Sequence, residues 1–395
     1  MTKNNTKNST TNHTNHHEPS LRNKIASSCR WCGSWSKKGI ISIGIVASIL
    51  ILIAGVSLGS TNISFIDTIL ITLHKVFHLP LSADIGAKDV SIVWLLRLPR
   101  VILAFLVGGC LAMSGVVCQS ILRNPLASPY ILGVSSGASL GAGLIIISGI
   151  SLPFLFGFSL PLTGFVFGLL TVFFVASFSS RIDKSMSNNT IILCGMVMSL
   201  FLSALLSTLS AVFSDDLRRI VLWQMGSFAM RGWSYTTMLL PFFIIGTIGI
   251  FFRTREMDIL SFGDEQAKSA GVETGALRKR LLAFCAVLTG ASVALSGVIG
   301  FVDLIAPHAA RRIIGSQHKY LIPMSFITGG SLMVCTDLIA RTVIAHSELP
   351  VGAITALIGA PFFAYVYFRR SSRRDASRIR DKFYEQRTQR KKIGC

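Results

Sequence analysis

Three carboxylate side chains lie at positions where charge is unusual. Asp303, Asp337 and Glu348 lie inside or beside long apolar stretches of the chain. A carboxylate at membrane depth has to pair with a cation, face a water-filled cavity or take up a proton. These groups could therefore carry protons in an ion-coupled secondary transporter, and Asp303 could instead pair with an arginine near the outer surface.

Three arginines occupy equally unusual positions. Arg97 and Arg100 bracket a proline in WLLRLPRVILAF (94–105), and Arg341 ends the segment DLIAR (337–341). A guanidinium group is always charged and can pair with a carboxylate through two parallel hydrogen bonds. These side chains could receive acidic groups from a partner protein, or they could contact lipid headgroups at the membrane surface.

The sequence lacks the motifs of nucleotide hydrolysis and of zinc proteases. No glycine is followed directly by lysine, so there is no phosphate-binding loop ending in GK[ST], and no HExxH segment occurs. We therefore expect no enzymatic activity and no metal site in this chain. Any ATP hydrolysis would come from another subunit.

The elements that must position these side chains are apolar helices. Only 14% of the 395 residues are charged, whereas a soluble domain has about 25%. Apolar blocks of about 18 residues or more can cross a hydrocarbon layer about 30 Å thick, and continuous apolar runs exclude a barrel. The sequence predicts an all-α polytopic membrane protein with about ten transmembrane helices. The predicted spans are 39–58, 98–119, 130–150, 154–178, 190–212, 235–252, 281–300, 302–314, 321–340 and 350–368.

The net charge of +20 is concentrated at the two ends and in short loops, which argues against a nucleic-acid partner. Because Lys and Arg gather on the cytoplasmic side of membrane proteins, both termini are predicted to be cytoplasmic. We expect a disordered polar and basic tail at 1–38, a transmembrane domain at 39–368 with a cytoplasmic loop at 253–280, and a basic tail at 369–395.

The chain contains an internal repeat. Residues 104–133 match residues 286–315 at a constant offset of 182, with twelve identities that include Ser114-Gly115-Val116 and Ser296-Gly297-Val298. The copies are separated by an odd number of predicted spans, so they should have opposite orientations, as in transporters built from inverted repeats. Close packing of helices through Gly108, Ala112 and Gly115 would explain the small residues equally well.

Seven stretches carry a resemblance to a known family. They are RLPR (97–100), SGVVCQSILRNPLASPYILGVSSGAS (114–139), WQMGSF (223–228), FGDEQAKSAGV (262–272), SGVIGFVDLIAPHAAR (296–311), DLIAR (337–341) and ELPVGAITALIGAPFF (348–363). In order and spacing they resemble the FecCD family, the permease subunits of ATP-binding-cassette (ABC) importers for iron–siderophores, haem and vitamin B12.

The resemblance implies a ten-helix permease in the bacterial plasma (inner) membrane, paired with a second copy or a homologous permease. It also implies two cytoplasmic ATPase subunits, which use ATP and Mg, and a periplasmic or lipid-anchored substrate-binding protein. No cofactor is expected on this chain itself. Small and weakly polar stretches such as GVSSGASLGAG (133–143) suit a wide path for a polar chelate. The expected cargo is an iron chelate: a siderophore first, haem second and cobalamin third.

The resemblance also assigns roles to residues. It implies that Arg97, Arg100 and Arg341 dock the binding protein. It implies a cytoplasmic gate at Asn124 and Leu126, although Pro125 could simply end a helix there.

Further gate residues are implied at Asn188 and Asn189. The 253–280 loop would couple to the ATPases through four residues of the FGDEQAKSAGV stretch: Phe262, Gly263, Ala267 and Gly271. Asp303 departs from the family pattern, which usually has glycine there.

Overall fold

The computed structural model describes residues 37–59, 63–80, 85–150, 158–344 and 347–365. The predicted basic tail at 369–395, and all but the end of the predicted tail at 1–38, lie outside the described residues.

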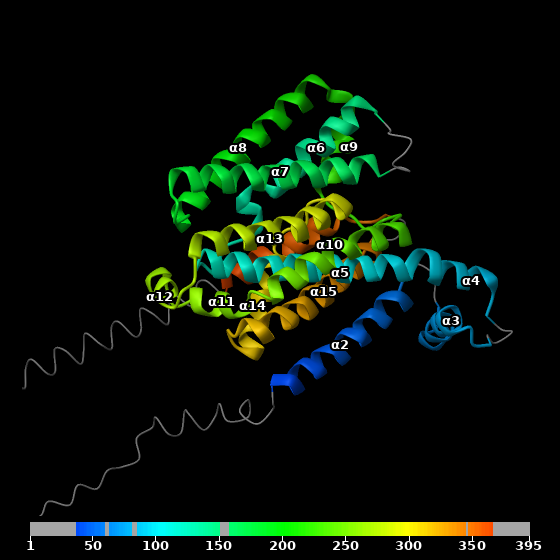
Figure 1. The fold of residues 1–395 in the computed structure, drawn as a ribbon. Coiled ribbons are helices and arrows are strands. Elements are labelled where there is room, and N and C mark those ends of the chain that lie inside the picture. The colour runs from blue at the N-terminus through cyan, green and yellow to red at the C-terminus, as the bar shows by residue number, and fades with distance from the viewer. Residues whose placement is uncertain (1–36, 60–62, 81–84, 151–157, 345–346, 366–395) are drawn as a thin grey trace, which may run out of the picture.

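The described part of the chain is built of helices, as predicted (Figure 1). Seven of them are long and apolar enough to cross a membrane. They are α2 (Lys37–Ser57), the continuous stretch Ala87–Ile121, α7 (Ser159–Ile182), α8 (Asn188–Val212), α10 (Trp233–Phe251), α13 (Thr274–Ser296) and α15 (His318–Thr342). The shorter helices α6 (Val134–Ser148), α14 (Val302–Ile314) and Val351–Tyr365 coincide with the other three predicted spans. The count of ten crossings stays a prediction.

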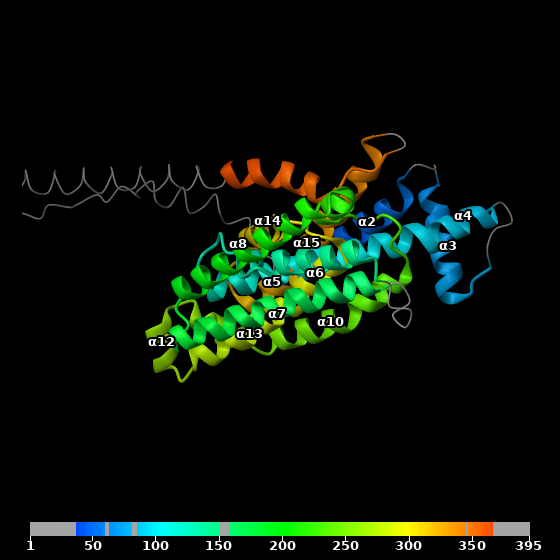
Figure 2. The same cartoon turned by 90° about the horizontal axis from the view of Figure 1, so that it is seen from above.

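The stretch Ala87–Ile121 is the centre of the bundle. It consists of α4 (Ala87–Ser91), a π-helical turn η2 (Ile92–Arg97) and α5 (Leu98–Ile121). Figure 2 shows α10 and α13 on one side of α5 and the Val351–Tyr365 helix on the other. The most apolar window of this stretch is 89% buried, whereas that of α8 is 17% buried. The helix α5 therefore forms the core, and α8 lies at the periphery.

Small residues allow the close approach of helices around α5. A methyl group added to Gly108 would collide with the backbone of Gly329 in α15, and one added to Gly115 would collide with the backbone of Asp303 in α14. The packing interpretation of these glycines is therefore correct. It is compatible with the internal repeat, because the same residues can serve both.

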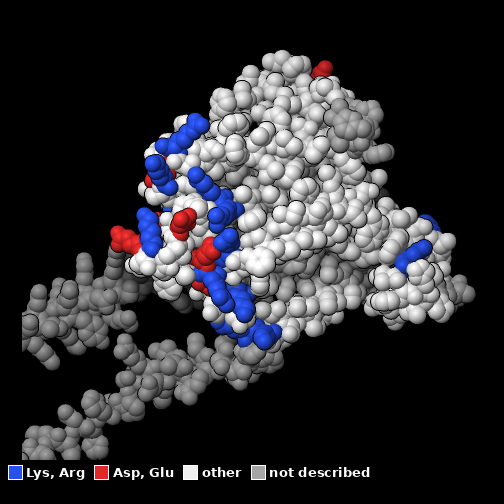
Figure 3. Space-filling model, in the orientation of Figure 1, with Lys and Arg blue, Asp and Glu red and all other residues white. Residues whose placement is uncertain are grey.

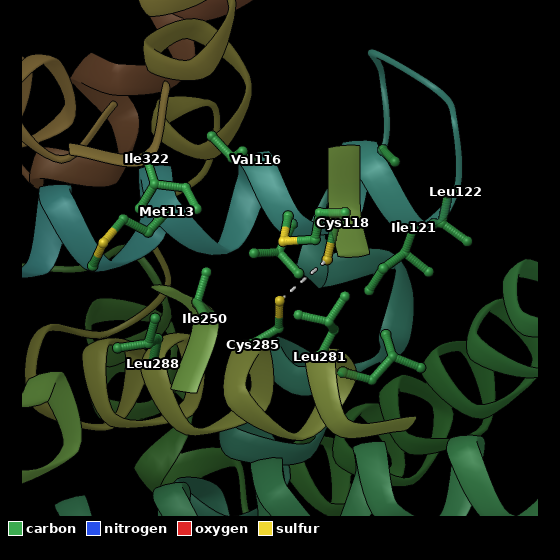
Figure 4. Packing of buried hydrophobic residues seen from close by; sticks show 14 of the residues in the cluster. Met113, Val116, Cys118, Ile121, Leu122, Ile250, Leu281, Cys285, Leu288 and Ile322 are labelled. Carbon is green, nitrogen blue, oxygen red and sulfur yellow. Dashed lines mark hydrogen bonds between the residues drawn. The ribbon is translucent and has the colours of Figure 1, made fainter. Parts of the chain in front are cut away.

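The helices that contain the two repeat copies run in opposite directions. In Figure 1, α5 leads away from α4 and α13 runs back toward it. Cys118, near the end of α5, faces Cys285 in the middle of α13, with the two sulfur atoms 3.9 Å apart (Figure 4). The identical Ser-Gly-Val triplets nevertheless adopt different structures. The helix α5 continues through Gly115, whereas α13 ends at Ser296 and is followed by Gly297, whose φ of +79° is in the left-handed region that favours glycine.

Several helices lie outside the predicted spans. The helix α3 (Phe65–Phe77) begins where Ser64 Oγ accepts a hydrogen bond from the Ile66 amide. The short helices α9 (Leu217–Gln224), α11 (Thr254–Leu260) and α12 (Asp264–Ser269) connect longer ones. The helix α13 begins at Thr274, so the end of the predicted 253–280 loop is already helical.

Candidate functional site

Charged side chains mark the two ends of the bundle. On the face drawn in Figure 3 most of them gather over α11 and α12, at the end that we call the α12 end. The opposite end, which carries α3 and α4, we call the α3 end. The predicted site residues divide between these two ends.

Asp264 is the centre of the network at the α12 end. It is the first residue of α12 and accepts hydrogen bonds from Arg123 Nη2 at 2.5 Å and from Arg278 Nη2 at 2.9 Å. Arg123 follows α5 and Arg278 lies in the second turn of α13. The two arginines thus clamp one carboxylate that comes from the predicted coupling loop.

Arg278 extends this network to the start of α8. Its side chain is fully buried and donates from Nη1 to the carbonyl oxygens of Ser185 and Met186 at 2.9 and 2.8 Å. Its Nη2 also donates to Asn188 Oδ1 at 3.2 Å, and Asn188 Nδ2 donates to the Leu122 carbonyl at 2.9 Å. One guanidinium group therefore links α12 and α13 to the α7–α8 turn, and Asn188 continues the link to the end of α5.

The turn that presents these carbonyls is fixed by Asp183. Its carboxylate accepts hydrogen bonds from the Ser185 hydroxyl, from the Ser185 amide and from the Ser187 amide. These hydrogen bonds, with that of the Ser185 hydroxyl foremost, hold the pKa of Asp183 well below its ordinary value. Met186 has a φ of +49°, a conformation that a non-glycine residue adopts only when its surroundings impose it.

The structure brings only part of the predicted gate into this network. Asn188 is a member, whereas Asn189 is exposed. Asn124 Oδ1 accepts a hydrogen bond from the Leu126 amide at 2.9 Å, which is the geometry of a turn, and the Leu126 side chain is 40% exposed. The gate role of these residues stays a prediction.

The predicted coupling residues lie in residues 262–272, which we call the α12 segment. Ala267 is fully buried, so it anchors the segment to the core. Phe262 is 78% exposed, so its large apolar side chain is left uncovered by the described part of the chain. Gly263 and Gly271 have φ values of +133° and +80°, which glycine adopts without strain.

At the α3 end, Arg100 is the central residue. It is paired with Asp337 (Nη2–Oδ1, 2.8 Å) and with Glu348 (Nη1–Oε1, 2.8 Å). Arg341 lies 3.6 Å from Asp337 and donates to the Gly55 carbonyl. Arg97 donates to the Ser57 carbonyl at 2.7 Å. All three predicted docking arginines therefore have partners within the chain.

These arginines line a common cavity of about 720 Å³. A fourth arginine, Arg231, also lines it, stacked over the ring of Tyr235, and Glu348 is the one carboxylate among its described lining residues. The cavity therefore carries an excess of positive charge. The ion pairs of these arginines were not predicted from the sequence, although the four-residue spacing of Asp337 and Arg341 is a signal for one of them.

Asp303 does not pair with any arginine among the described residues. It is fully buried and accepts a hydrogen bond from Ser128 Oγ, which also accepts from the Tyr130 amide. It thus ties the first turn of α14 to the turn after α5. Since Asp337 and Glu348 are both paired with Arg100, two of the three carboxylates of the ion-coupled hypothesis are held in salt bridges.

Comparisons with known proteins agree on one family. The model of the FecCD transport family matches residues 46–369. An uncharacterized ABC transporter permease, YvrB of Bacillus subtilis, is 42% identical over 80% of this chain and 90% of its own length. The hemin transport system permease HmuU of Yersinia pestis is 38% identical over 71% of this chain and 85% of its own. A solved structure described as an inward-facing metal-chelate type ABC transporter is 32% identical, with a TM-score of 0.73 over 84% of this chain and 99% of its own.

Proposed function

The chain belongs to the FecCD transport family, and we propose that it is the permease subunit that forms the membrane path of an ABC importer for an iron chelate. A ferric siderophore is the first candidate cargo, followed by haem and cobalamin. The observation that carries the proposal is the network at the α12 end, because it links an exposed surface segment to buried helices. Such a link is what a permease driven by an external motor requires.

The motor consists of two ATPase subunits, which bind ATP and Mg and contact the α12 segment. The exposed Phe262 supplies an apolar contact, and the rest of the segment is fixed by Ala267 and Asp264. When the ATPases close, displacement of α12 pulls on Arg278 through its salt bridge. Arg278 transmits the movement to the α7–α8 turn and to Asn188.

The gate lies at the next step of this chain of contacts. Asn188 holds the Leu122 carbonyl, and Asn124 and Leu126 follow in the same turn. Movement of Asn188, with Asn189 beside it, would therefore shift the end of α5 and open or close the path. This mechanism requires the α12 end to lie in the cytoplasm.

The cavity at the α3 end docks a periplasmic or lipid-anchored substrate-binding protein. Its excess positive charge attracts acidic side chains, and a carboxylate that enters it would meet Arg97, Arg100 and Arg341 together. Because opposite charges accelerate and orient encounter, the docking rate should fall as salt is added.

A second permease, either the same chain or a homologue, completes the path. The helix α8 is the natural contact, because it leaves apolar side chains such as Leu200 (70% exposed) on the surface. The path would then run between the two permeases.

The test is a pull-down of the tagged chain from native membranes, with mass spectrometry of the proteins that copurify. We expect an ATPase with a phosphate-binding loop and a substrate-binding protein. The Phe262→Ala variant should recover about tenfold less ATPase, as for a contact residue of an interface. Phe252→Ala is the matched control, because Phe252 is 79% exposed near the same end but lies outside the α12 segment. A chain that purifies without an ATPase would contradict the proposal.

A further inference from the structure

A groove lined by serines lies between α6, α8 and α9. It has a volume of about 610 Å³, and its lining includes the serines 135, 136 and 139 of α6 and the serines 203, 207 and 210 of α8. Ser203, Ser207 and Ser210 follow one another at spacings of four and three residues, so they share one face of α8. Ser135 and Ser139 are likewise one turn apart on α6, which packs against α8 (Figure 1).

Four of the six serine hydroxyls in this groove have no hydrogen-bond partner among the described residues, whereas Ser203 Oγ donates to Ser136 Oγ at 3.2 Å. Serine and threonine in a helix commonly donate to the carbonyl four residues earlier, and on α8 Ser199 and Thr208 do so at 2.8 and 2.9 Å. Ser139 is only 6% exposed, lines the groove, and has no hydrogen-bond partner among the described residues. Ser207 has none there either. Lipid tails cannot accept hydrogen bonds from hydroxyls that face the groove, so the groove is suited to a polar occupant rather than to lipid.

The groove offers hydrogen bonds without charge. Apart from the six serines, the described residues that line it are Gln224 and apolar side chains, and none is charged. A multiply charged ligand would lose its hydration there and gain no counter-charge, which is unfavourable at membrane depth. A ligand of low net charge with many oxygen acceptors would lose little hydration free energy and could accept hydrogen bonds from the serines.

We propose that the serine groove contacts the chelate during its passage and selects chelates of low net charge that are rich in acceptor oxygens. The fitting class is a ferric trihydroxamate, in which the ligand charges cancel the charge of iron. A ferric tricatecholate keeps a large negative charge and is disfavoured. This inference rests on the proposed permease function and narrows its cargo.

The test follows the reactivity of a cysteine placed in the groove. The Ser207→Cys variant is reconstituted with the copurifying ATPase and binding protein, and alkylation of its peptide by a maleimide is timed by mass spectrometry. A ferric trihydroxamate should slow the labelling by about tenfold, equivalent to about 1.4 kcal/mol of protection, whereas a ferric tricatecholate at equal concentration should leave it unchanged. Thr208→Cys is the matched control, because Thr208 is exposed on the same helix and does not line the groove. Its labelling should not respond to either chelate.

A second variant tests the charge selection itself. The double variant Ser139→Arg/Ser207→Cys has a cation in the groove. In this variant the negatively charged tricatecholate should bind and slow the labelling of the cysteine. Equal protection by both chelates without that cation would overturn the charge selection. If neither chelate slowed the labelling while the binding protein still stimulated ATPase activity, the role of the groove would be wrong but the permease proposal would stand. Loss of that stimulation in the unsubstituted complex would overturn the permease proposal, and this inference with it.

Discussion

Each end of the bundle is organised around one buried arginine, but the two arginines differ in what they hold. Arg100, at the α3 end, pairs with Asp337, whose side chain is 1% exposed and lies on a long helix. Arg278, at the α12 end, pairs with Asp264, whose side chain is 29% exposed and lies on a short surface helix. The first pair joins two parts of the core, whereas the second ties a surface segment to the core.

This difference separates stability from coupling. Loss of a carboxylate inside the core leaves a buried charge without compensation, which destabilises the fold. Loss of the surface carboxylate Asp264 releases the α12 segment. The buried Arg278 loses its ion pair as well, but its hydrogen bonds to the carbonyls of Ser185 and Met186 and to Asn188 remain and limit the loss of stability. Damage at the α3 end should therefore appear first in unfolding, and damage at the α12 end first in transport.

The largest effect is expected for Asp337→Ala. Arg100 and Arg341 both lose a buried partner, which should lower the free energy of unfolding by about 3–5 kcal/mol. Thermal unfolding in detergent measures the change. Asp216→Ala is the control, because Asp216 pairs with an Arg219 that is 71% exposed, and such pairs contribute about 0–1 kcal/mol. Equal stability losses in the two variants would contradict a structural role for Arg100.

Asp264→Ala should break the coupling. Uptake per ATP hydrolysed is expected to fall about tenfold, within the usual range of coupling free energies, while the unfolding temperature changes less than in Asp337→Ala. The neighbouring Glu265→Ala is the control, because Glu265 is exposed and outside the network. If Asp264→Ala unfolded at a lower temperature than Asp337→Ala but kept normal uptake per ATP, the α12 end would have the structural role instead of the coupling role.

Arg97→Gln tests docking at the α3 end. The neutral side chain keeps a hydrogen-bond donor for the Ser57 carbonyl but removes one charge from the cavity. We expect the binding protein to associate several times more slowly at low salt, with a smaller difference at high salt. Arg218→Gln, an exposed arginine that does not line the cavity, should leave the rate unchanged. Surface plasmon resonance at two salt concentrations decides between these outcomes.

Gly271→Ala should have the smallest effect. A side chain at φ +80° is strained by about 1 kcal/mol, but it meets no neighbouring atom within the chain. A modest loss of ATPase stimulation is therefore expected, and a bulkier residue at this position should uncouple more strongly if an ATPase covers it. If Ser269→Ala reduced ATPase stimulation by the same amount, the loss in Gly271→Ala could not be attributed to the backbone conformation of the glycine.

Hydropathy predicted most of the fold, because the spans are long and uniformly apolar. It missed α3, since that helix is amphipathic and, with 13 residues, too short to cross the hydrocarbon layer. It also could not distinguish the two Ser-Gly-Val triplets. Their different structures depend on distant neighbours: Gly115 packs against the backbone of Asp303, and Gly297 against the carbonyl of Trp223.

The family resemblance named Arg100 and Asn188 as site residues, but it did not name their partners. Arg100 finds Asp337 and Glu348 at separations of 237 and 248 residues, and Arg278 finds Asn188 at 90. Such pairs are set by how the helices pack, so a single sequence contains no local signal for them. The structure therefore added the connection between the predicted coupling loop and the predicted gate.

We propose that this chain moves a chelate with energy that separate ATPase subunits supply through the α12 end. Uptake of radioactive iron chelate into proteoliposomes tests it most directly, with the chain alone and with its copurifying ATPase and binding protein. We predict uptake only in the complete complex, only with ATP, and greatly reduced in Asp264→Ala. Uptake by the chain alone under an imposed proton gradient would contradict this proposal and favour a secondary transporter in which Asp303 carries protons.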